Sequence, residues 1–595
     1  MSKKVLAVIL SLILAFSVVA VPVGAADITL PETGIENVLN YYLDRIIHVV
    51  LSFLNMFWPG YEGGWDTEEG YQTENFYEGD TNFENEVNPA AQWELGYAGV
   101  SLLDGMDPMN GKYFLAGSLE IVAGRVPTKV LDDQRVRVYA ISDGVGGTLV
   151  HAVIDGFGLP RGDVNEIRER LAAFAEENNI VSLNISVLHQ HSAIDTLGMN
   201  IPLLQGLIAN TGNAASGGLI ESAKIQKNPE FMERVFNKTV FAIKKAVKSM
   251  KAGSLYYGTA DVSDYIRDKR DPQAFDPNIN RLRFVPDDGS AETWVLEGAI
   301  HCTGNGAGGS VLTADYPYYI EKAINEKVGA NVVYILGAEL AIGMRTVRLC
   351  LECQEVAEIS KPTEEGGIYE ISCPSCGKKT MPDDDDDFTT EDAQDYVATV
   401  DEWYRMNTPD VTDYDFDLID YGYSVAKRVI DIDNDVELDP VLNVAHKEVA
   451  VDVENQILTL AAREDILNAV IVKSGNGYKM ITEIGYMELG TDGNKVGVFL
   501  CPGEFDPILV FGGPESGAES WSGEEWSMPA LKDNTDCENI MVIGLCNDQA
   551  GYVLRDTEYH SILSENEEIN VISKTAGSTF VGEFMNLIAD VNEAA

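Results

Sequence analysis

From about Trp93 onwards, short apolar runs alternate with longer amphipathic stretches, and this alternation limits the possible folds more than any other feature of the sequence. Runs rich in β-branched residues predict strands, and the helical period of apolar residues between them predicts helices. Interleaved strands and helices with hairpin-like pairs indicate an α/β (α+β) fold, with mixed β-sheets flanked by helices. The predicted strands are 135–142, 148–155, 180–188, 293–300, 330–335, 495–500 and 540–543, and the predicted helices are 164–177 and 230–252.

The charge balance restricts the class of partner. Lys and Arg number 42 against 95 Asp and Glu, which leaves a formal net charge of −53 at pH 7. Such a charge repels phosphate backbones and anionic lipid headgroups, so we expect no nucleic-acid partner. The chain is nonetheless 45% hydrophobic over 595 residues, which is enough to bury a large core.

The first residues have the order of a secretory signal peptide. Lys3 and Lys4 precede an apolar run that extends to about Val21, and small residues follow it as far as Ala26. We therefore expect residues 1–25 to be removed. The mature protein is then secreted, or extracytoplasmic and associated with the cell surface.

Residues 26–92 form a separate N-terminal region in this interpretation. The apolar stretch at 46–58 is too short to span a bilayer, which needs about 20 residues. It is either an amphipathic helix that docks on the main domain or an interfacial membrane helix. Residues 59–92 are rich in Gly, Glu, Asp and Asn, which predicts an exposed acidic linker. No segment of the mature chain is expected to cross a membrane.

Two CxxC pairs interrupt the alternation of strands and helices. They comprise Cys350 and Cys353, then Cys373 and Cys376. Each pair presents two thiolates to one ion, so together they favour a closed, structural zinc site. Two disulfides are the alternative in an exported protein. We expect a zinc-ribbon insertion at 349–388 that divides the main domain into parts at 93–348 and 389–595.

The other cysteines carry weaker signals. A disulfide between Cys537 and Cys546 stays open on the sequence alone, because an oxidising compartment would permit it. Cys302 and Cys501 neighbour polar residues at strand ends and are typical of small apolar fillers.

Polar residues follow several of the predicted strands. His189 and His191 come after the strand at 180–188, and in an extended chain residues i and i+2 point to the same face. Such a pair is either a pair of metal ligands or a hydrogen-bonded structural pair. His301 and Glu504 each follow another predicted strand. Loops at strand ends that carry several ligand types are the usual place for a site in an α/β protein.

Four ordered motifs give this arrangement a specific resemblance. They are His189-Gln-His191-Ser192, then His301 with a downstream Thr313-Ala-Asp-Tyr-Pro317, then Pro502-Gly-Glu504-Phe505, then the loop from Gly544 to Tyr552. The series resembles the neutral (non-lysosomal) ceramidase family, and it is more specific than any one motif. The likeness covers roughly residues 96–348 and 395–575.

The resemblance implies one zinc ion bound by His189, His301, Glu504 and Tyr552, with His191 beside it as a proton shuttle. It also implies a secreted zinc-dependent hydrolase of an amide (N-acyl) bond that uses metal-activated water. The substrate would be small or lipid-like. A substrate-binding role falls on Arg270, which lies in a stretch similar to the family's Arg-rich, Asp-Pro segment. Asp155, at the end of an early strand, is at most a support for the site.

One departure from the family pattern concerns a serine. The family's Gly-Asp/Asn-x-Ser-Pro loop corresponds here to residues 337–343, which contain no serine, and Glu339 supplies a carboxylate there. We therefore expect His191 and Glu339 to be the catalytic residues if the chain is an enzyme. The alternative is a non-catalytic exported zinc-binding protein that keeps the hydrolase scaffold for ligand or partner binding.

Overall fold

The computed structural model describes residues 67–592 apart from several internal stretches. These stretches are 118–124, 199–225, 271–272, 305–308, 345–347, 350–355, 361–369, 373–374, 378–412, 464–465, 476, 514–519, 521 and 560–569. The predicted signal peptide and the apolar stretch at 46–58 lie outside the described residues. Among the described residues, no helix combines the length and the apolar character that a membrane span requires.

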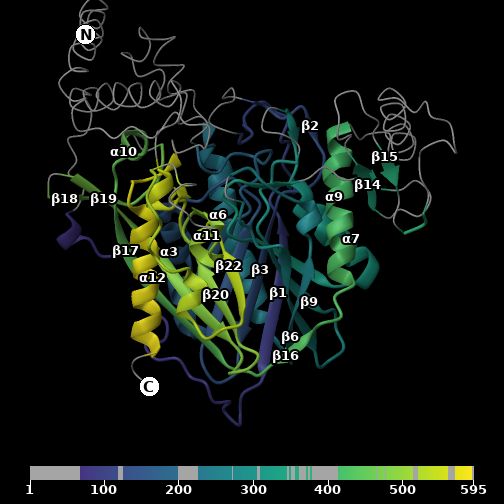
Figure 1. Ribbon diagram of the computed structural model, residues 1–595, viewed down its shortest axis with the longest axis horizontal. Helices are drawn as coiled ribbons and strands as arrows, with labels where there is room; N and C mark the ends of the chain where they lie inside the picture. The colour runs from purple at the N-terminus through teal and green to yellow at the C-terminus, as the bar shows by residue number, and fades with distance from the viewer. Residues whose placement is uncertain are drawn as a thin grey trace, which may run out of the picture.

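The larger of the two main sheets is mixed and has nine strands (Figure 1). Its order is β11-β9-β8-β6-β1-β3-β4-β5, with β16 paired to β6. The two outermost pairs, β11 with β9 and β4 with β5, are parallel, and the pairs between them are antiparallel. The bounds are β1 (Trp93–Ser101), β3 (Arg135–Ser142), β4 (Thr148–Ile154), β5 (Ile180–Val187), β6 (Lys251–Asp261), β8 (Asn278–Pro286), β9 (Thr293–Gly298), β11 (Asn331–Leu336) and β16 (Val436–Leu438).

Helices cover this sheet in two groups. α3 (Arg161–Glu177) and α6 (Pro229–Lys248) pack over β1, β3, β4 and β5, whereas α7 (Asp315–Val328) packs on β11 and against α9 (Asp413–Ile430). Local signals set the ends of these helices. The Asn228 side chain accepts a hydrogen bond from the Phe231 amide at the start of α6, and Gly329 ends α7 with φ 81°.

The second sheet has five strands, in the order β17-β19-β20-β22 with β18 beside β19. Their bounds are β17 (Leu442–Asp452), β18 (Ile471–Ser474), β19 (Gly477–Leu489), β20 (Val496–Leu500) and β22 (Asn539–Ile543). α12 (Ala576–Asn592) lies along β17 and β19 (Figure 1). Its apolar face, which includes Phe580 and Phe584, is buried in the core of this half of the molecule. α10 (Gln456–Arg463) lies between β17 and β18 in the chain.

The region predicted to be an exposed linker instead packs on the second sheet from Thr67 onwards. Phe83 is buried and stacks on Tyr486 at 5.8 Å between ring centroids, and Gly79 forms a β-bridge with Ala445. The prediction underestimated this segment because its apolar residues are few and widely spaced. Thr67 and Gly79 nevertheless pair with Lys473 and Ala445, in strands that come far later in the chain.

The predicted strands are present, with ends that differ by a residue or two. The main difference concerns the helix predicted at 230–252. It ends at Lys248, and β6 begins at Lys251 because this segment pairs with β1 and β8. The mixed α/β fold class is confirmed.

A small antiparallel sheet occupies the position of the predicted zinc ribbon. It consists of β13 (Arg348–Leu349), β14 (Val356–Ser360) and β15 (Glu370–Ser372). Cys350, Cys353 and Cys373 lie outside the described residues, whereas Cys376 is described and exposed. Cys302, Cys501, Cys537 and Cys546 are buried, and none of these four forms a disulfide.

Candidate functional site

Five chain segments converge where strands of both sheets end. His189 follows β5, His301 follows β9 and Glu339 follows β11. Glu504 begins β21 (Glu504–Phe505) after β20, and Tyr552 begins β23 (Tyr552–Val553) after β22. The carboxyl ends of strands are where α/β proteins usually place their ligands. All five of these side chains are buried.

The loop after β22 joins the two edges of the large sheet at this end. The Gly544 amide donates to Leu336 at the end of β11, and the Asn547 amide donates to Ile185 in β5. The Asn547 side chain in turn accepts from the Ile185 amide at 2.9 Å. This loop therefore closes the space that β5, β9 and β11 leave open and leads directly to Tyr552.

His189 is held in a fixed orientation. Its φ of 48° lies in the left-handed region, so the chain turns sharply at this residue rather than remaining extended. Its Nδ1 lies 2.8 Å from the Phe157 carbonyl oxygen and donates to it, and the Phe157 ring stacks on the imidazole at 4.3 Å. The proton on Nδ1 leaves the Nε2 lone pair available, and Nε2 lies 3.5 Å from Glu504 Oε1.

His301 lies between two carboxyl groups. Its Nδ1 lies 3.6 Å from Glu339 Oε2, and its Nε2 lies 3.7 Å from Glu504 Oε2. The two Nε2 atoms of His189 and His301 thus face the two oxygens of one carboxylate. An outer carboxylate or carbonyl on the second ring nitrogen is the usual partner of a metal-binding histidine.

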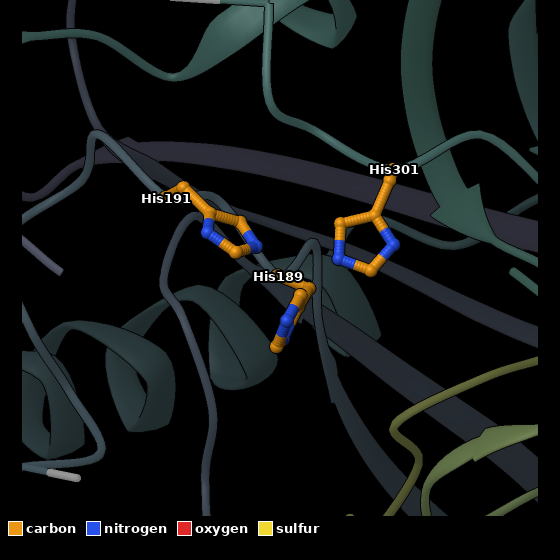
Figure 2. A group of neighbouring side chains, drawn as sticks. All are labelled: His189, His191 and His301. Atoms are coloured by element: carbon orange, nitrogen blue, oxygen red, sulfur yellow. The ribbon is translucent and has the colours of Figure 1, made fainter. Parts of the chain in front are cut away.

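His191 is the third imidazole of the cluster, and Figure 2 shows the three rings directed toward one another. Its ring centroid lies 4.9 Å from that of His189 and 5.2 Å from that of His301. Unlike the other two, it has no hydrogen-bond partner for either ring nitrogen among the described residues. Its backbone is held by Cys302 and Arg125, so the ring is positioned by the main chain.

Tyr552 is brought to Glu504 by strand pairing. The two residues are register partners in the parallel pair of β21 and β23, and the Glu504 amide donates to Gly551 at 3.0 Å. Tyr552 also packs against Leu340, next to Glu339. The backbone therefore places a phenol beside the carboxylate that faces the imidazoles.

Burial controls the charge of the cluster. Burial lowers the pKa of His189 to about 4, and the hydrogen bond to Phe157 opposes this only in part. Burial and the neighbouring imidazoles and cations lower the pKa values of His191 and His301 well below 6.5. Burial and the nearby Glu504 raise the pKa of Glu339 well above 4.5. The histidines are therefore neutral at pH 7, as metal ligands must be.

These residues fit a divalent cation on their own geometry. Among the described residues, two overlapping groups have donor atoms within 4.8 Å of one another: the three histidines, and His301 with Glu339 and Glu504. Neither carboxylate oxygen of Glu339 has a hydrogen-bond partner in the described part of the chain. Buried carboxylates and uncharged imidazoles without hydrogen-bond partners are costly unless a cation compensates them. A mixed nitrogen and oxygen donor set of this kind suits zinc.

Arg270, predicted to bind substrate, lies just after β7 (Ile266–Asp268), and its amide donates to the Asp268 carboxylate at 2.9 Å. β7 pairs with β12 (Ile342–Met344), and the carbonyl of Ile342 accepts from the His301 amide. The segment of Arg270 therefore borders the site.

A second set of catalytic residue types lies elsewhere and is sealed. Ser182 Oγ is 2.8 Å from His446 Nε2, and His446 Nδ1 is 3.2 Å from Glu483. All three side chains are buried, and Glu483 is neutralised by Arg161 and Arg168. These contacts join β5 of the large sheet to β17 and β19 of the second sheet. Because Arg161 and Arg168 hold the charge of Glu483, this set is assigned to the packing of the two sheets.

No protein-family model matches this sequence, and no curated protein matches it. The fold does match solved structures. The crystal structure of neutral ceramidase from Pseudomonas aeruginosa aligns with a TM-score of 0.53 and 12% identity over 85% of this chain and 75% of that one. A structure of a ceramidase complexed with C2 aligns with a TM-score of 0.51 and 11% identity, over 85% and 76%.

The chain has a neutral-ceramidase fold. The resemblance predicted from the ordered motifs is therefore confirmed at the level of the fold. The structure also brings together His189, His191, His301, Glu339, Glu504 and Tyr552, all six residues that the sequence assigned to one centre. The sequence interpretation missed Phe157, which holds His189, and Gln190, which lies between the two histidines. The only signal for either was its nearness to a predicted site residue.

Proposed function

We propose that the protein is a zinc-dependent hydrolase of an amide (N-acyl) bond. The observation that carries this proposal is the pair of Nε2 atoms, from His189 and His301, facing both oxygens of Glu504 in a buried site. The neutral-ceramidase fold gives this geometry its reaction class by analogy. His189, His301, Glu504 and Tyr552 would hold the ion. Zinc bound there would polarise an amide carbonyl and lower the pKa of water toward ~7.

The remaining side chains have separate roles in this proposal. His191 exchanges a proton with the reacting groups, because its ring nitrogens have no partner in the described chain. Glu339 was expected to be catalytic from the sequence. Its carboxyl group lies 3.6 Å from Nδ1 of His301, beyond hydrogen-bond distance, and this position supports a positioning role beside the ring.

The missing serine favours a second candidate function. Residues 337–343 offer Glu339 and the left-handed Ala341 (φ 64°) where the family pattern has a hydroxyl. A chain that binds zinc and an N-acyl ligand without cleaving it would have the same ligand set. The two functions differ in turnover rather than in zinc content.

One set of measurements separates them. Zinc-loaded protein is incubated with a panel of N-acyl substrates that includes ceramides, and the released acid is measured. For an enzyme, Glu504→Gln lowers turnover by orders of magnitude, whereas Glu297→Gln, a buried glutamate outside the site, leaves it within a few fold. Wild-type protein that binds zinc and N-acyl ligands but releases no acid would support the binding function and rule out the hydrolase.

We also propose a structural zinc ion in the four-cysteine segment. β13 and β15 both pair antiparallel with β14, so they run in the same direction and end at the same edge of the small sheet. β13 ends immediately before Cys350, and β15 ends immediately before Cys373. This placement supports two CxxC turns that share one ion.

Elemental analysis tests both metal proposals together. Two zinc ions per chain are expected, and His301→Ala should remove only one of them. A wild-type protein that holds a single zinc ion, and keeps it after His301→Ala, would exclude zinc from the histidine site. Export remains a proposal that rests on residues 1–25, and N-terminal sequencing of the mature protein tests it.

A further inference from the structure

Gln190 lies between the two histidines of the cluster and is itself completely buried. Its Nε2 donates two hydrogen bonds, one to Asp155 Oδ1 at 2.9 Å and one to the Ala314 carbonyl at 2.7 Å. Because both partners are acceptors, the amide orientation is determined. The Gln190 side chain therefore anchors the turn from which both imidazoles project.

Asp155 is a rigid anchor for this amide. Arg137 contacts both carboxylate oxygens of Asp155 at 2.7 Å, and the Arg135 amide donates to Oδ2 at 2.7 Å. Burial alone would raise the pKa of Asp155, but the charges of Arg137 and Arg135 and the hydrogen bonds from Arg137 and Gln190 together outweigh it, and the net shift is downward. Asp155 is therefore a buried anion with its charge already paired, and it accepts from Gln190 without an added penalty.

Ala314 connects this anchor to the segment that follows His301. It precedes Asp315, whose φ of 61° is left-handed and whose carboxylate accepts from the Gly304 amide at 3.0 Å. Gly304 lies three residues after His301. Gln190 thus ties the loop of His189 and His191 to the segment that controls the path of the chain after His301.

The turn needs such an anchor. A left-handed φ at His189 costs on the order of 1 kcal/mol and persists only where surrounding contacts over-determine it. The Gln190 amide donates to Gly156 and the His191 amide donates to Cys302, and these bonds hold the backbone on either side of the Gln190 Cα. The side-chain bonds to Asp155 and Ala314 add a connection from the same residue to two further segments.

We propose that Gln190 is a positioning residue of the zinc site: through Asp155 and Ala314 it holds His189 in place as a ligand and His191 in place beside the ion. This inference rests on the proposed zinc-dependent function. Residues that orient the metal ligands without contacting the metal typically contribute 10- to 100-fold to metal affinity. Loss of the Gln190 amide should therefore weaken zinc binding about tenfold without removing any ligand.

The test compares zinc affinities by competition with a chromophoric chelator. Gln190→Met keeps the length of the side chain and removes both hydrogen bonds, and Gln190→Glu places a carboxylate against Asp155. The matched control is Gln226→Met, a buried glutamine that donates to the Leu115 carbonyl at 3.1 Å. A His301→Ala chain measures the zinc that the cysteine segment retains, and that amount is subtracted.

We expect the zinc dissociation constant of Gln190→Met to rise about tenfold and that of Gln190→Glu to rise further. The zinc dissociation constant of Gln226→Met should stay within twofold of the wild-type value, even if the thermal stability of this variant falls as much as that of Gln190→Met. The cobalt-substituted proteins should show altered d–d absorption only in the Gln190 variants. A merely structural glutamine would change stability and leave both readings unchanged.

A dissociation constant for Gln190→Met within twofold of the wild type would overturn the positioning role and leave the zinc site standing. Wild-type protein that binds no zinc beyond the amount in His301→Ala would overturn the proposed function, and this inference with it. If Gln190→Met does not fold, Gln190→Asn, whose amide is one methylene short of its partners, is held to the same thresholds.

Discussion

Replacing Glu339 with glutamine should stabilise the metal-free protein and weaken its zinc site, two effects with opposite sign. Burial, with Glu504 nearby, raises the pKa of Glu339 well above 4.5 in the folded protein. The folded state therefore retains a proton that the unfolded state releases above pH 4.5. Stability is lost as the pH rises through this range, at about 1.4 kcal/mol per pH unit.

The size of the first effect follows from that slope. Each pH unit above 4.5 over which Glu339 stays protonated adds about 1.4 kcal/mol to the penalty, and a glutamine avoids it. The second effect comes from the lost negative charge on the Nδ1 side of His301. Loss of such an outer carboxylate weakens metal binding by about 10- to 100-fold, or roughly 1.4 to 2.7 kcal/mol.

Urea unfolding at pH 5 and pH 7, with chelator and with excess zinc, measures both effects. Glu297→Gln is the matched control, because Glu297 is also buried and lies outside the zinc site. Burial and the nearby Asp276 raise the pKa of Glu297 well above its usual value. The control substitution should stabilise the protein at pH 7 without changing zinc affinity. Two results together would refute the reasoning. They are a Glu339→Gln protein that is less stable than the wild type at pH 7 without zinc, and a zinc affinity that the substitution leaves unchanged.

Three further predictions concern residues outside the cluster. Glu483→Gln should lower the free energy of unfolding, measured in urea, by about 3–5 kcal/mol, because Arg161 and Arg168 would stay buried without the charge of Glu483. A decrease below about 1 kcal/mol would contradict this. Burial lowers the pKa of His151 from 6.5 to about 3, so stability present above pH 6.5 is lost as the pH falls toward 3. His151→Gln should remove one proton, about 1.4 kcal/mol per pH unit, from that acid slope, and an unchanged slope would exclude His151 as its source. Gly503→Ala would bring a Cβ to 2.5 Å from the Gly551 carbonyl oxygen. We therefore expect the free energy of unfolding, measured by thermal unfolding, to fall by about 1–3 kcal/mol, and zinc binding to weaken. Normal zinc affinity would show that the pairing of β21 with β23 tolerates the shift.

Much of the fold could be predicted from local patterns. β4 is buried along its whole length and is mostly apolar, and β3 is rich in Val and Ile, so the positions of both strands follow from the sequence. The segment at 251–261 could not be assigned in this way. It continues the lysine-rich end of α6, and it becomes a strand because β1 and β8 lie on either side of it.

The candidate site divides in the same way. The order of the motifs picked out His189, His301, Glu504 and Tyr552, and the structure brings all four to one place. The predicted reason for the convergence of His189 and His191 was wrong, because the chain is not extended there. A left-handed turn at His189 directs the rings, with Gln190 anchored between them.

The sequence by itself determined the ligand types and the strand ends that carry them, because strand periodicity and short motifs depend on neighbouring residues. Only the tertiary structure decided which nitrogen of each imidazole faces Glu504, since that depends on Phe157, which accepts from Nδ1 of His189, and on Glu339, which lies on the Nδ1 side of His301. It also showed that Ser182, His446 and Glu483 are sealed. Residues more than a hundred positions apart meet through sheet pairing and packing, and local patterns carry no record of either.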